Sequence, residues 1–171
     1  MEFLELAKER FAVRNYKEQQ IEQEKLDKIL EAAQVAPTAA NYQAQRIYVL
    51  QSEEALAKIR SITRCAFNAP TVMMVGYDAD EDWKNALEEG VHSGEQDASI
   101  VATHMMLEAW ELGIGSCWVN VFPNTETAEK FGLPDNIKLV LLMPMGYPAD
   151  NAVPSPKHSI MKDVSEFTQM L

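Results

Sequence analysis

The sequence has few of the features that mark disulfide-bonded, fibrous or membrane-spanning proteins. Its two cysteines, Cys65 and Cys117, are too few for a disulfide framework and too far apart for a CxxC motif. Glycine and proline number 7 and 8, which excludes a collagen-like or low-complexity chain. No apolar run reaches the ~20 residues needed to cross a bilayer. We therefore expect residues 1–171 to form one globular domain in which both thiols are reduced and buried.

Positive charge is also scarce. The chain has 15 Lys and Arg against 26 Asp and Glu, which gives a net charge of −11. Nucleic acids and anionic membrane surfaces repel such a chain at long range, so we expect no nucleic-acid and no membrane partner. The first five residues (MEFLE) have neither the basic start nor the apolar core of a signal peptide. Together these features predict a cytoplasmic protein.

Several familiar catalytic motifs are missing. The GIG sequence at 113–115 follows a helical pattern and lacks the third glycine of a dinucleotide fingerprint, and there is no P-loop. Ser93 lacks the flanking glycines of a nucleophile elbow. The three histidines are His92, His104 and His158. None of them belongs to an HExxH motif or an acid–histidine cluster, so no metal site is predicted. Any chemistry would then come from a bound cofactor, without a catalytic side chain.

The hydrophobic pattern mixes helices and strands without strict βαβ alternation, which favours an α+β fold. A first helix is expected over 3–9, with Phe3, Leu4, Leu6 and Ala7 on its inner side. Further helices are expected from residue 26 to the residue before Pro37, after an N-cap at Ser52, over 95–112, and from an N-cap at Asn124 to Gly132. Strands are expected over 46–50, 71–77, 116–121 and 138–145.

The helix expected over 95–112 is apolar almost all round, which is typical of a helix in the middle of a fold. Its polar residues form one narrow stripe: Asp97, His104, Glu108 and Glu111. Gly113 is predicted to end it in a left-handed conformation. Eight acids meet one lysine between residues 78 and 97, a run typical of a solvated face or a mobile excursion.

Two arginines stand out against the acidic background. On their spacing alone, Arg10 and Arg14 are either ordinary surface residues or an anion site, in which forked guanidinium donors bind a phosphate. A second segment, APTAANYQ at 36–43, joins a helix to a strand. Its small residues let the backbone approach a flat ligand, and the amides of Asn41 and Gln43 can read a carbonyl and imide edge.

These segments, taken with three others, resemble the FMN-dependent nitroreductase family. The family pattern Arg-x-Ser-x-Arg is matched by Arg10, Ala12 and Arg14, and the pattern Ala-Pro-Ser-x-x-Asn-x-Gln by residues 36–43. The other matches are the strand after AP at 69–70, the helix that begins DA at 97–98 and closes in LGIGSCW at 112–118, and the strand that closes in GYP at 146–148. Their order and spacing agree over nearly the whole chain.

The resemblance implies an α+β, nitroreductase-like fold: a central, mainly antiparallel sheet flanked by helices, in an intertwined homodimer with one FMN in each of two interface clefts. The tail, residues 151–171, would be an arm that packs on the partner subunit. Arg10, Phe11 and Ala12 would hold the ribityl phosphate, and Arg14 would lie near the pyrimidine edge. The remaining implied cofactor-binding residues are Val35, Pro37, Thr38 and Ala39 from the other subunit, Asn41 and Gln43 shaping the cleft, Trp118, Val119 and Asn120 with backbone amides towards N5, and Lys157 or His158 near the phosphate.

The same resemblance implies that hydride passes from NADH or NADPH to flavin N5. Electrons would then pass to a small-molecule acceptor, such as a nitroaromatic or a quinone, in ping-pong fashion. Three departures bear on FMN affinity more than on fold: Ala12 replaces the usual Ser, AQ at 44–45 replaces Pro-Trp, and the tail has KH at 157–158 instead of a clear Arg. Two alternatives stay open, a flavin-binding storage or sensor protein without significant turnover and an acidic dimer without cofactor. No extra motif supports a specialised relative such as a reductive dehalogenase.

Overall fold

The computed structural model describes residues 2–171. The α-helices are α1 (Phe3–Glu9), α2 (Gln23–Val35), α3 (Glu53–Ile62), α4 (Gly94–Glu111) and α5 (Asn124–Lys130), and the strands are β1 (Gln45–Leu50), β2 (Thr71–Asp78), β3 (Gly115–Ser116) and β4 (Ile137–Gly146). Short 3-10 helices lie at η1 (Ala39–Asn41), η2 (Arg64–Ala66) and η3 (Val164–Glu166). The predicted cap of α3 is confirmed, because Ser52 Oγ accepts the N–H of Ala55.

The strands form one antiparallel sheet in the order β1-β2-β4-β3. A bulge interrupts the pairing of β2 with β4, where Val75 faces Leu141 and the next residue, Gly76, faces Leu139. Only glycine fits at this bulge, because a Cβ on Gly76 would lie 2.3 Å from the carbonyl oxygen of Lys138. The prediction of a central antiparallel sheet in an α+β fold is confirmed.

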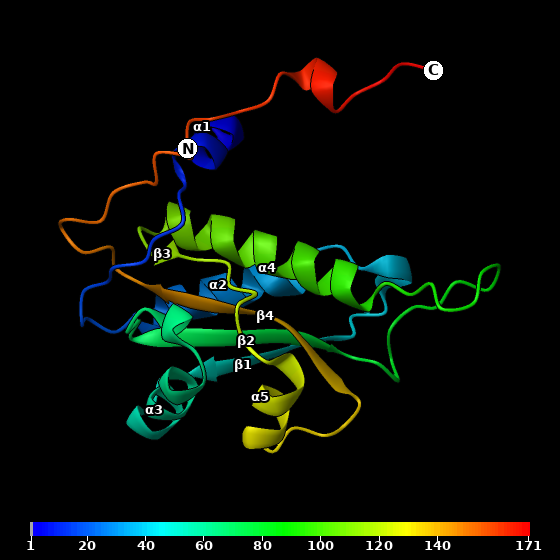
Figure 1. Cartoon of the computed structure of the whole chain (residues 1–171), viewed down its shortest axis with the longest axis horizontal. Helices are drawn as coiled ribbons and strands as arrows, with labels where there is room; N and C mark the ends of the chain where they lie inside the picture. The colour runs from blue at the N-terminus through cyan, green and yellow to red at the C-terminus, as the bar shows by residue number, and fades with distance from the viewer. Residues whose placement is uncertain (1) are drawn as a thin grey trace.

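Helices cover both faces of the sheet (Figure 1). α2 and α4 lie on one face, while α3 and α5 lie on the other. Ile29 of α2, Met105 of α4 and Met143 of β4 belong to the first hydrophobic core. Leu56 of α3 and Leu142 of β4 belong to the second. Successive residues of β4 thus serve opposite cores, as the two-residue period of a strand requires.

The long central helix, α4, matches its predicted range to within one residue. It ends at Gly113, whose φ of 78° is left-handed as expected. On one side, Val101, Met105 and Ala109 are fully buried against the first core. On the other side Ile100 retains 38% of its exposure. Within one chain, α4 is therefore covered on one side.

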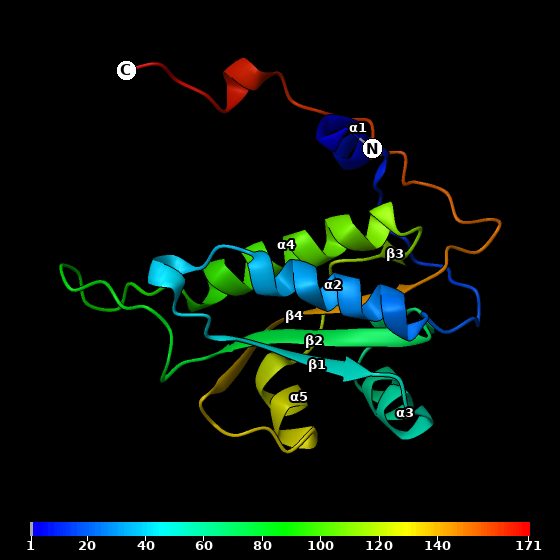
Figure 2. The ribbon, with the colours of Figure 1, turned by 180° about the vertical axis from the view of Figure 1, so that it is seen from behind.

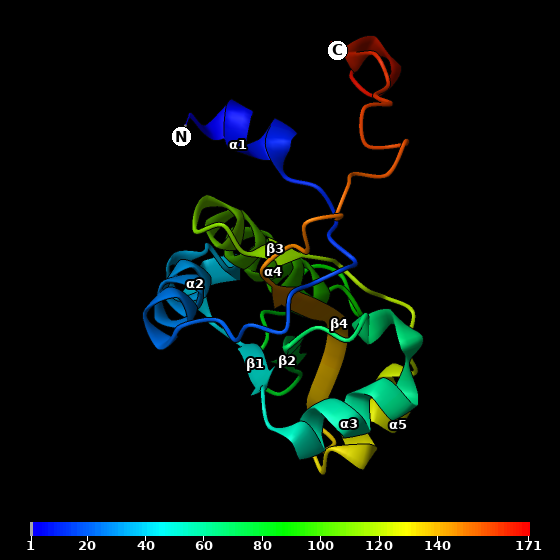
Figure 3. The same ribbon diagram turned by 90° about the vertical axis from the view of Figure 1, so that its left-hand side faces the viewer.

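Both ends of the chain lie apart from the sheet, and for α1 this differs from the prediction. α1 is expected to have an inner apolar side, but none of its residues is buried, and Phe3 and Leu4 are 63% and 66% exposed. The tail lies away from the sheet as well, with Phe167 67% exposed. Figure 3 shows α1 and the tail above α4, apart from the body of the chain. Apolar side chains at both ends thus remain in contact with solvent in a single copy.

Two local predictions are wrong. The strand expected over 116–121 is reduced to β3. The N–H of Cys117 still donates to the carbonyl oxygen of Pro144, but Pro144 has no N–H to return the bond, and the pairing resumes only in a bridge between Val119 and Leu142. Asn124 does not cap α5 but is its first residue. Its Nδ2 instead donates to the carbonyl oxygen of Leu139 at 2.8 Å, which fixes α5 to β4.

The acidic segment before α4 is only partly a solvated face. Asp78, Asp82 and Asp97 are all buried. Asp82 forms ion pairs with Lys84 and with His92, whose Nδ1 lies 2.7 Å from Asp82 Oδ2. A carboxylate leaves water at an acceptable free-energy cost only where such partners replace the lost hydration. The inner side of this segment is therefore folded onto the protein.

Both cysteines are free thiols, as predicted, although Cys65 is only half-buried while Cys117 is buried. Among residues 2–171, no helix combines the length and apolarity that crossing a bilayer requires. The same residues contain no group of three or more His, Cys, Asp or Glu side chains arranged to hold a metal ion.

Candidate cofactor site

The segment that carries the two arginines lies against β3. Ala12 forms a parallel bridge with Ser116, and the N–H of Val13 donates to the carbonyl oxygen of Ser116 at 3.0 Å. This approach requires Gly115, because a Cβ there would lie 2.5 Å from Val13 Cγ2. The structure thus brings together two predicted site segments that are far apart in the sequence.

Arg10 and Arg14 differ in exposure on this segment. Arg10 is half-buried, and burial lowers the pKa of its guanidinium group from the ordinary value. Arg14 is exposed, and its Nη1 donates to the carbonyl oxygen of Ala12 at 3.2 Å. Within residues 2–171, neither guanidinium group forms an ion pair with a carboxylate. In a chain of net charge −11, two such cations on one segment fit an anionic group such as a phosphate.

The buried thiol of Cys117 lies within reach of both positive charges. Burial raises the pKa of this thiol, and the positive charges of Arg14 and Arg10 oppose that rise. A positive field therefore reaches the end of β3. Such a field stabilises negative charge on any ligand bound beside it.

The tail brings His158 to the same segment. Its Nε2 lies 3.0 Å from the carbonyl oxygen of Lys8, and its ring meets that of Phe11 edge-on with centroids 6.3 Å apart. Phe11 also packs edge-on against Trp110 of α4 at 5.2 Å. Lys157 is exposed. A cavity of about 310 Å³ opens between residues 12–15 and 151–156, with Arg14 in its wall.

The segment after β3 holds Trp118, Val119 and Asn120 in three different environments. Val119 is buried, and its N–H donates to the carbonyl oxygen of Leu142 at 2.9 Å. The prediction that all three amides face a ligand is therefore wrong for Val119, whose amide is used by β4. Alternation along the segment turns the amides of Trp118 and Asn120 the other way. Trp118 Nε1 also donates to Asn120 Oδ1 at 2.5 Å.

The loop from Val35 to Gln43 has an unusual backbone. Val35 and Pro37 are exposed, while Thr38 Oγ1 accepts the N–H of Gln43 at 3.1 Å. Ala40, Asn41 and Gln43 have φ values of 48°, 58° and 52°, the left-handed region that residues with a Cβ rarely adopt. A loop with three such residues presents a fixed shape that other contacts must maintain.

This loop and the arginine segment do not meet within one chain. The N–H of Ala39 donates to Asp97 Oδ1 in the first turns of α4 at 3.0 Å, whereas the segment at Arg10 lies by the residues that follow the end of α4. α4 has 18 residues, which corresponds to about 27 Å. Figure 2 shows the light-blue turn at η1 beside one end of α4 and β3 beside the other.

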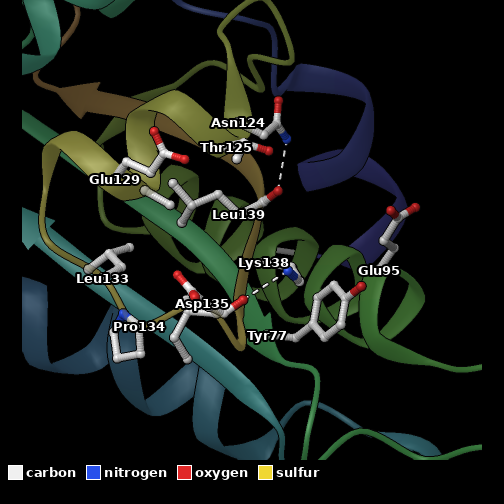
Figure 4. Close-up of a pocket in the computed structure, with 12 residues that line it drawn as sticks. Tyr77, Glu95, Asn124, Thr125, Glu129, Leu133, Pro134, Asp135, Lys138 and Leu139 are labelled. Atoms are coloured by element: carbon white, nitrogen blue, oxygen red, sulfur yellow. Dashed lines mark hydrogen bonds between the residues drawn. The ribbon is translucent and has the colours of Figure 1, made fainter.

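A larger cavity lies elsewhere. About 660 Å³ in volume, it is bounded by α5, the start of β4 and the first turn of α4. Figure 4 shows Glu95, Glu129 and Asp135 around it, with Lys138 Nζ donating to the carbonyl oxygen of Asp135 at 2.8 Å. None of the predicted cofactor residues lines this cavity. Its acidic wall does not suit a phosphate.

One residue with a structural connection to the candidate site was not singled out by the sequence patterns. Asp97 is 3% exposed and contacts the loop at Ala39, whereas the acidic run at 78–97 to which it belongs is typical of a solvated face. The signal that could have revealed it is its position, a carboxylate near the N-terminus of an otherwise apolar helix.

Comparisons with known proteins agree with this fold. The sequence profile of the Nitroreductase family matches residues 7–68 and 63–147. A nitroreductase family protein from Clostridium difficile 630 is 37% identical in sequence, and the two structures superpose with a TM-score of 0.91 over 99% of this chain and 98% of that one.

Two further relatives carry more specific names. An Archaeoglobus fulgidus protein provisionally named NADH dehydrogenase/NAD(P)H nitroreductase is 33% identical over 156 residues, which is 87% of each chain. An FMN-dependent nitroreductase from Clostridium difficile R20291 is 27% identical, with a TM-score of 0.71 over 94% of this chain and 99% of that one. The chain, with its antiparallel sheet and its arginine segment beside β3, belongs to the Nitroreductase family.

Proposed function

We propose that the protein is an FMN-dependent oxidoreductase that uses NADH or NADPH to reduce small-molecule acceptors. The names of the two more specifically named relatives support both the nicotinamide reductant and the flavin. The observation that carries the proposal is the half-buried Arg10, which has no carboxylate partner among the described residues although the chain is strongly acidic. A phosphate group would supply the missing negative charge.

The separation of the two predicted site segments, one at each end of α4, supports a homodimer. The arginine segment and the loop 35–43 lie about 27 Å apart along α4, so one chain cannot place both on the same flavin ring. A second copy, placed so that its loop meets the arginine segment, completes the site. The exposed apolar residues of α1 and of the tail, such as Phe3 and Phe167, would be covered by that copy.

Each predicted residue then has a task. Arg10, with the backbone at Phe11 and Ala12, binds the ribityl phosphate, and His158 or Lys157 closes the same end. Arg14 would hold the pyrimidine edge, where its charge would favour the reduced form of the ring. The amides of Trp118 and Asn120 flank the ring, opposite Val35, Pro37, Thr38 and Ala39 of the second copy, while Asn41 and Gln43 shape the entrance.

The chemistry requires no acid or base from the chain. FMN held there would supply the transfer of hydride from NAD(P)H and of electrons to a second molecule. The described residues supply orientation and a positive field around it. We infer that reductant and acceptor use the same cleft in turn, which is ping-pong kinetics, and that nitroaromatics and quinones are the acceptors.

Purification tests the cofactor, and kinetics test the reaction. We expect the protein to carry flavin absorbance or to gain it when FMN is added, and NAD(P)H to bleach that absorbance without oxygen. Initial rates with a quinone or a nitroaromatic should give parallel double-reciprocal lines. A flavin that stays oxidised in NAD(P)H would favour a storage or sensor protein, whereas a protein that refuses FMN would contradict the whole proposal.

The domain organisation is part of the same proposal. Residues 1–171 form one FMN-binding domain, and residues 151–171 act as an arm across the partner subunit. The tail supports this role because it reaches the arginine segment through His158 and then continues with exposed apolar side chains.

A further inference from the structure

Asp97 is a buried carboxylate with two neutral donors. It is 3% exposed, its Oδ1 accepts the N–H of Ala39 at 3.0 Å, and its Oδ2 accepts the hydroxyl of Ser93 at 2.7 Å. No ion pair to Asp97 occurs among residues 2–171. A buried carboxylate held only by neutral groups must be well satisfied, so both hydrogen bonds matter to its placement.

The hydrogen bond from Ala39 to Asp97 connects the turn at residues 38–43 to α4. Inside the turn, Asn41 and Tyr42 donate backbone N–H groups to Thr38 and Ala39. Among the described residues, the bond to Asp97 is the hydrogen bond that leaves the turn between Thr38 and Gln43. Because three residues of the turn have positive φ, its shape depends on such outside contacts.

Ser93, the other hydrogen-bond partner of Asp97, connects this carboxylate to the acidic segment as well. The N–H of Ser93 donates to the carbonyl oxygen of Trp83 at 2.9 Å, and its carbonyl oxygen accepts the N–H of Asp97 at 2.8 Å. One end of α4, the turn at 38–43 and the acidic segment are therefore joined at a single carboxylate.

We propose that Asp97 is a positioning residue for the cofactor site of the other subunit. It holds the turn at 38–43 in the shape that contacts the flavin bound to the arginine segment of the second copy. Asp97 itself touches neither cofactor nor substrate. This inference rests on the proposed function, since it assumes that the turn from one chain meets the flavin held by another.

A role limited to the stability of α4 makes a different prediction. In that case, loss of Ser93 and loss of Asp97 would lower the melting temperature and the FMN affinity together. If Asp97 positions the turn, Asp97→Ala should raise the FMN dissociation constant about tenfold or more, while Asp97→Asn, which keeps an acceptor for Ala39, should restore most of the affinity. Ser93→Ala, which leaves the bond to Ala39 in place, should change it about twofold or less.

Hydrogen exchange gives a readout that does not depend on activity. In Asp97→Ala we expect faster amide exchange over 38–43, with exchange over β2 and β4 unchanged. If Asp97→Ala does not fold, Ala39→Pro removes the donor and leaves α4 intact. Thr38 is already extended (φ −130°, ψ 156°), which a following proline tolerates. Because Ala39 itself is assigned to the flavin site, the readout for Ala39→Pro is amide exchange over 40–43 in the FMN-free protein. Faster exchange there than in the wild type supports the proposal, and unchanged exchange overturns it.

Mixed dimers decide whether Asp97 acts across the interface. Differently tagged Arg10→Ala and Asp97→Ala chains are coexpressed, and the mixed dimer is isolated by both tags. If each site takes Arg10 from one chain and the turn from the other, one site of the mixed dimer contains both substitutions and the other contains neither. We therefore expect one FMN per dimer with wild-type affinity. If Asp97 acts on the flavin of its own chain, each site has one lesion and no wild-type site remains.

The outcomes separate the two proposals. Unchanged FMN affinity in Asp97→Ala, or a mixed dimer without a wild-type site, overturns the role of Asp97. Wild-type affinity in the Arg10→Ala homodimer instead overturns the phosphate assignment on which the proposed function rests. In that event, the affinity and exchange of the Asp97→Ala homodimer still decide the positioning role.

Discussion

The residues around β3 differ in solvent exposure, and the exposure of an arginine affects how strongly it binds an anion. Arg10 is half-buried beside the buried Cys117, whereas Arg14 extends into solvent. A guanidinium group that loses part of its hydration without gaining a carboxylate binds an anion more strongly than an exposed one does. Cofactor affinity is therefore expected to depend on Arg10 more than on Arg14.

Replacement of Arg10 by Ala should weaken FMN binding by about 1.5–3 kcal/mol, roughly ten- to hundredfold, because a charge-assisted contact to phosphate is lost. Fluorescence titration of the apoprotein with FMN measures this change. Lys130→Ala on the outer side of α5, where Lys130 pairs with Glu126, is the matched loss of a cation and should leave the affinity unchanged. Equal affinities of the wild type and Arg10→Ala would contradict the assignment.

The two thiols should differ in reactivity. Burial raises the pKa of Cys117, and its side chain is almost inaccessible, whereas Cys65 is half-buried. In the native protein at neutral pH, iodoacetamide should therefore modify Cys65 much faster than Cys117, as peptide mass spectrometry would show. In denaturant the two rates should converge. Faster labelling of Cys117 in the native state would show that the end of β3 opens.

At the scale of helices and strands, hydrophobic periodicity predicts long elements better than short ones. The helices and strands with strong periodicity, such as α2, α4 and β4, lie where the sequence predicts them. The arginine segment and the strand end that leads into residues 118–120, both predicted to bind the cofactor, also lie side by side. Short elements were predicted less well, because β3 ends where Pro144 of β4 has no N–H for Cys117, and that depends on a residue outside the segment.

Burial of individual charged groups was equally hard to predict. A run of acids normally indicates solvent, yet Asp82 and Asp97 are buried because each also gains a partner from farther away along the chain, His92 for Asp82 and Ala39 for Asp97. Sequence spacing alone does not show such partners. The same limit applies to Val119, whose amide is used by a strand that follows much later in the chain.

The bulge between β2 and β4 should make Gly76 intolerant of any side chain. A Cβ would lie 2.3 Å from backbone oxygen, so Gly76→Ala must shift one of two central strands, at about 2–3 kcal/mol of the free energy of unfolding. Gly90→Ala, at a left-handed glycine with open space around it, should cost only about 1 kcal/mol. Urea unfolding compares the two, and equal losses would mean that the sheet accommodates the methyl group.

The acidic segment should make stability sensitive to acid through Asp82. Burial alone would raise the pKa of this carboxyl, but hydrogen bonds and charges from Lys84 and His92 outweigh burial and hold it below the usual value. A pKa lowered in the folded state contributes stability above the unfolded pKa of about 4, and that contribution is lost as the pH falls through the folded value. Below about pH 4, the wild type should therefore lose stability more steeply than Asp82→Asn in urea titrations. Parallel pH profiles would exclude this contribution.

At the scale of the whole molecule, the tail carries several apolar side chains that its own chain does not cover. Val153, Ile160, Met161 and Phe167 are all more than half exposed in one chain. Removal of residues 151–171 should shift the protein from dimer towards monomer in sedimentation velocity and weaken FMN binding, because His158 is lost with the arm. Removal of residues 168–171 alone is the matched control and should have a smaller effect. An unchanged dimer after the longer truncation would show that the arm does not join the subunits.

The length of α4 has a consequence for how this protein would behave on dilution. If the two halves of each cleft belong to different chains, a dissociated subunit has no complete cleft and releases its prosthetic group. Thermodynamic linkage then works in both directions: excess flavin mononucleotide must tighten the association of subunits by the same factor by which association tightens the flavin. Dilute enzyme would lose its yellow colour and its quaternary structure together, and supplying the coenzyme would restore both.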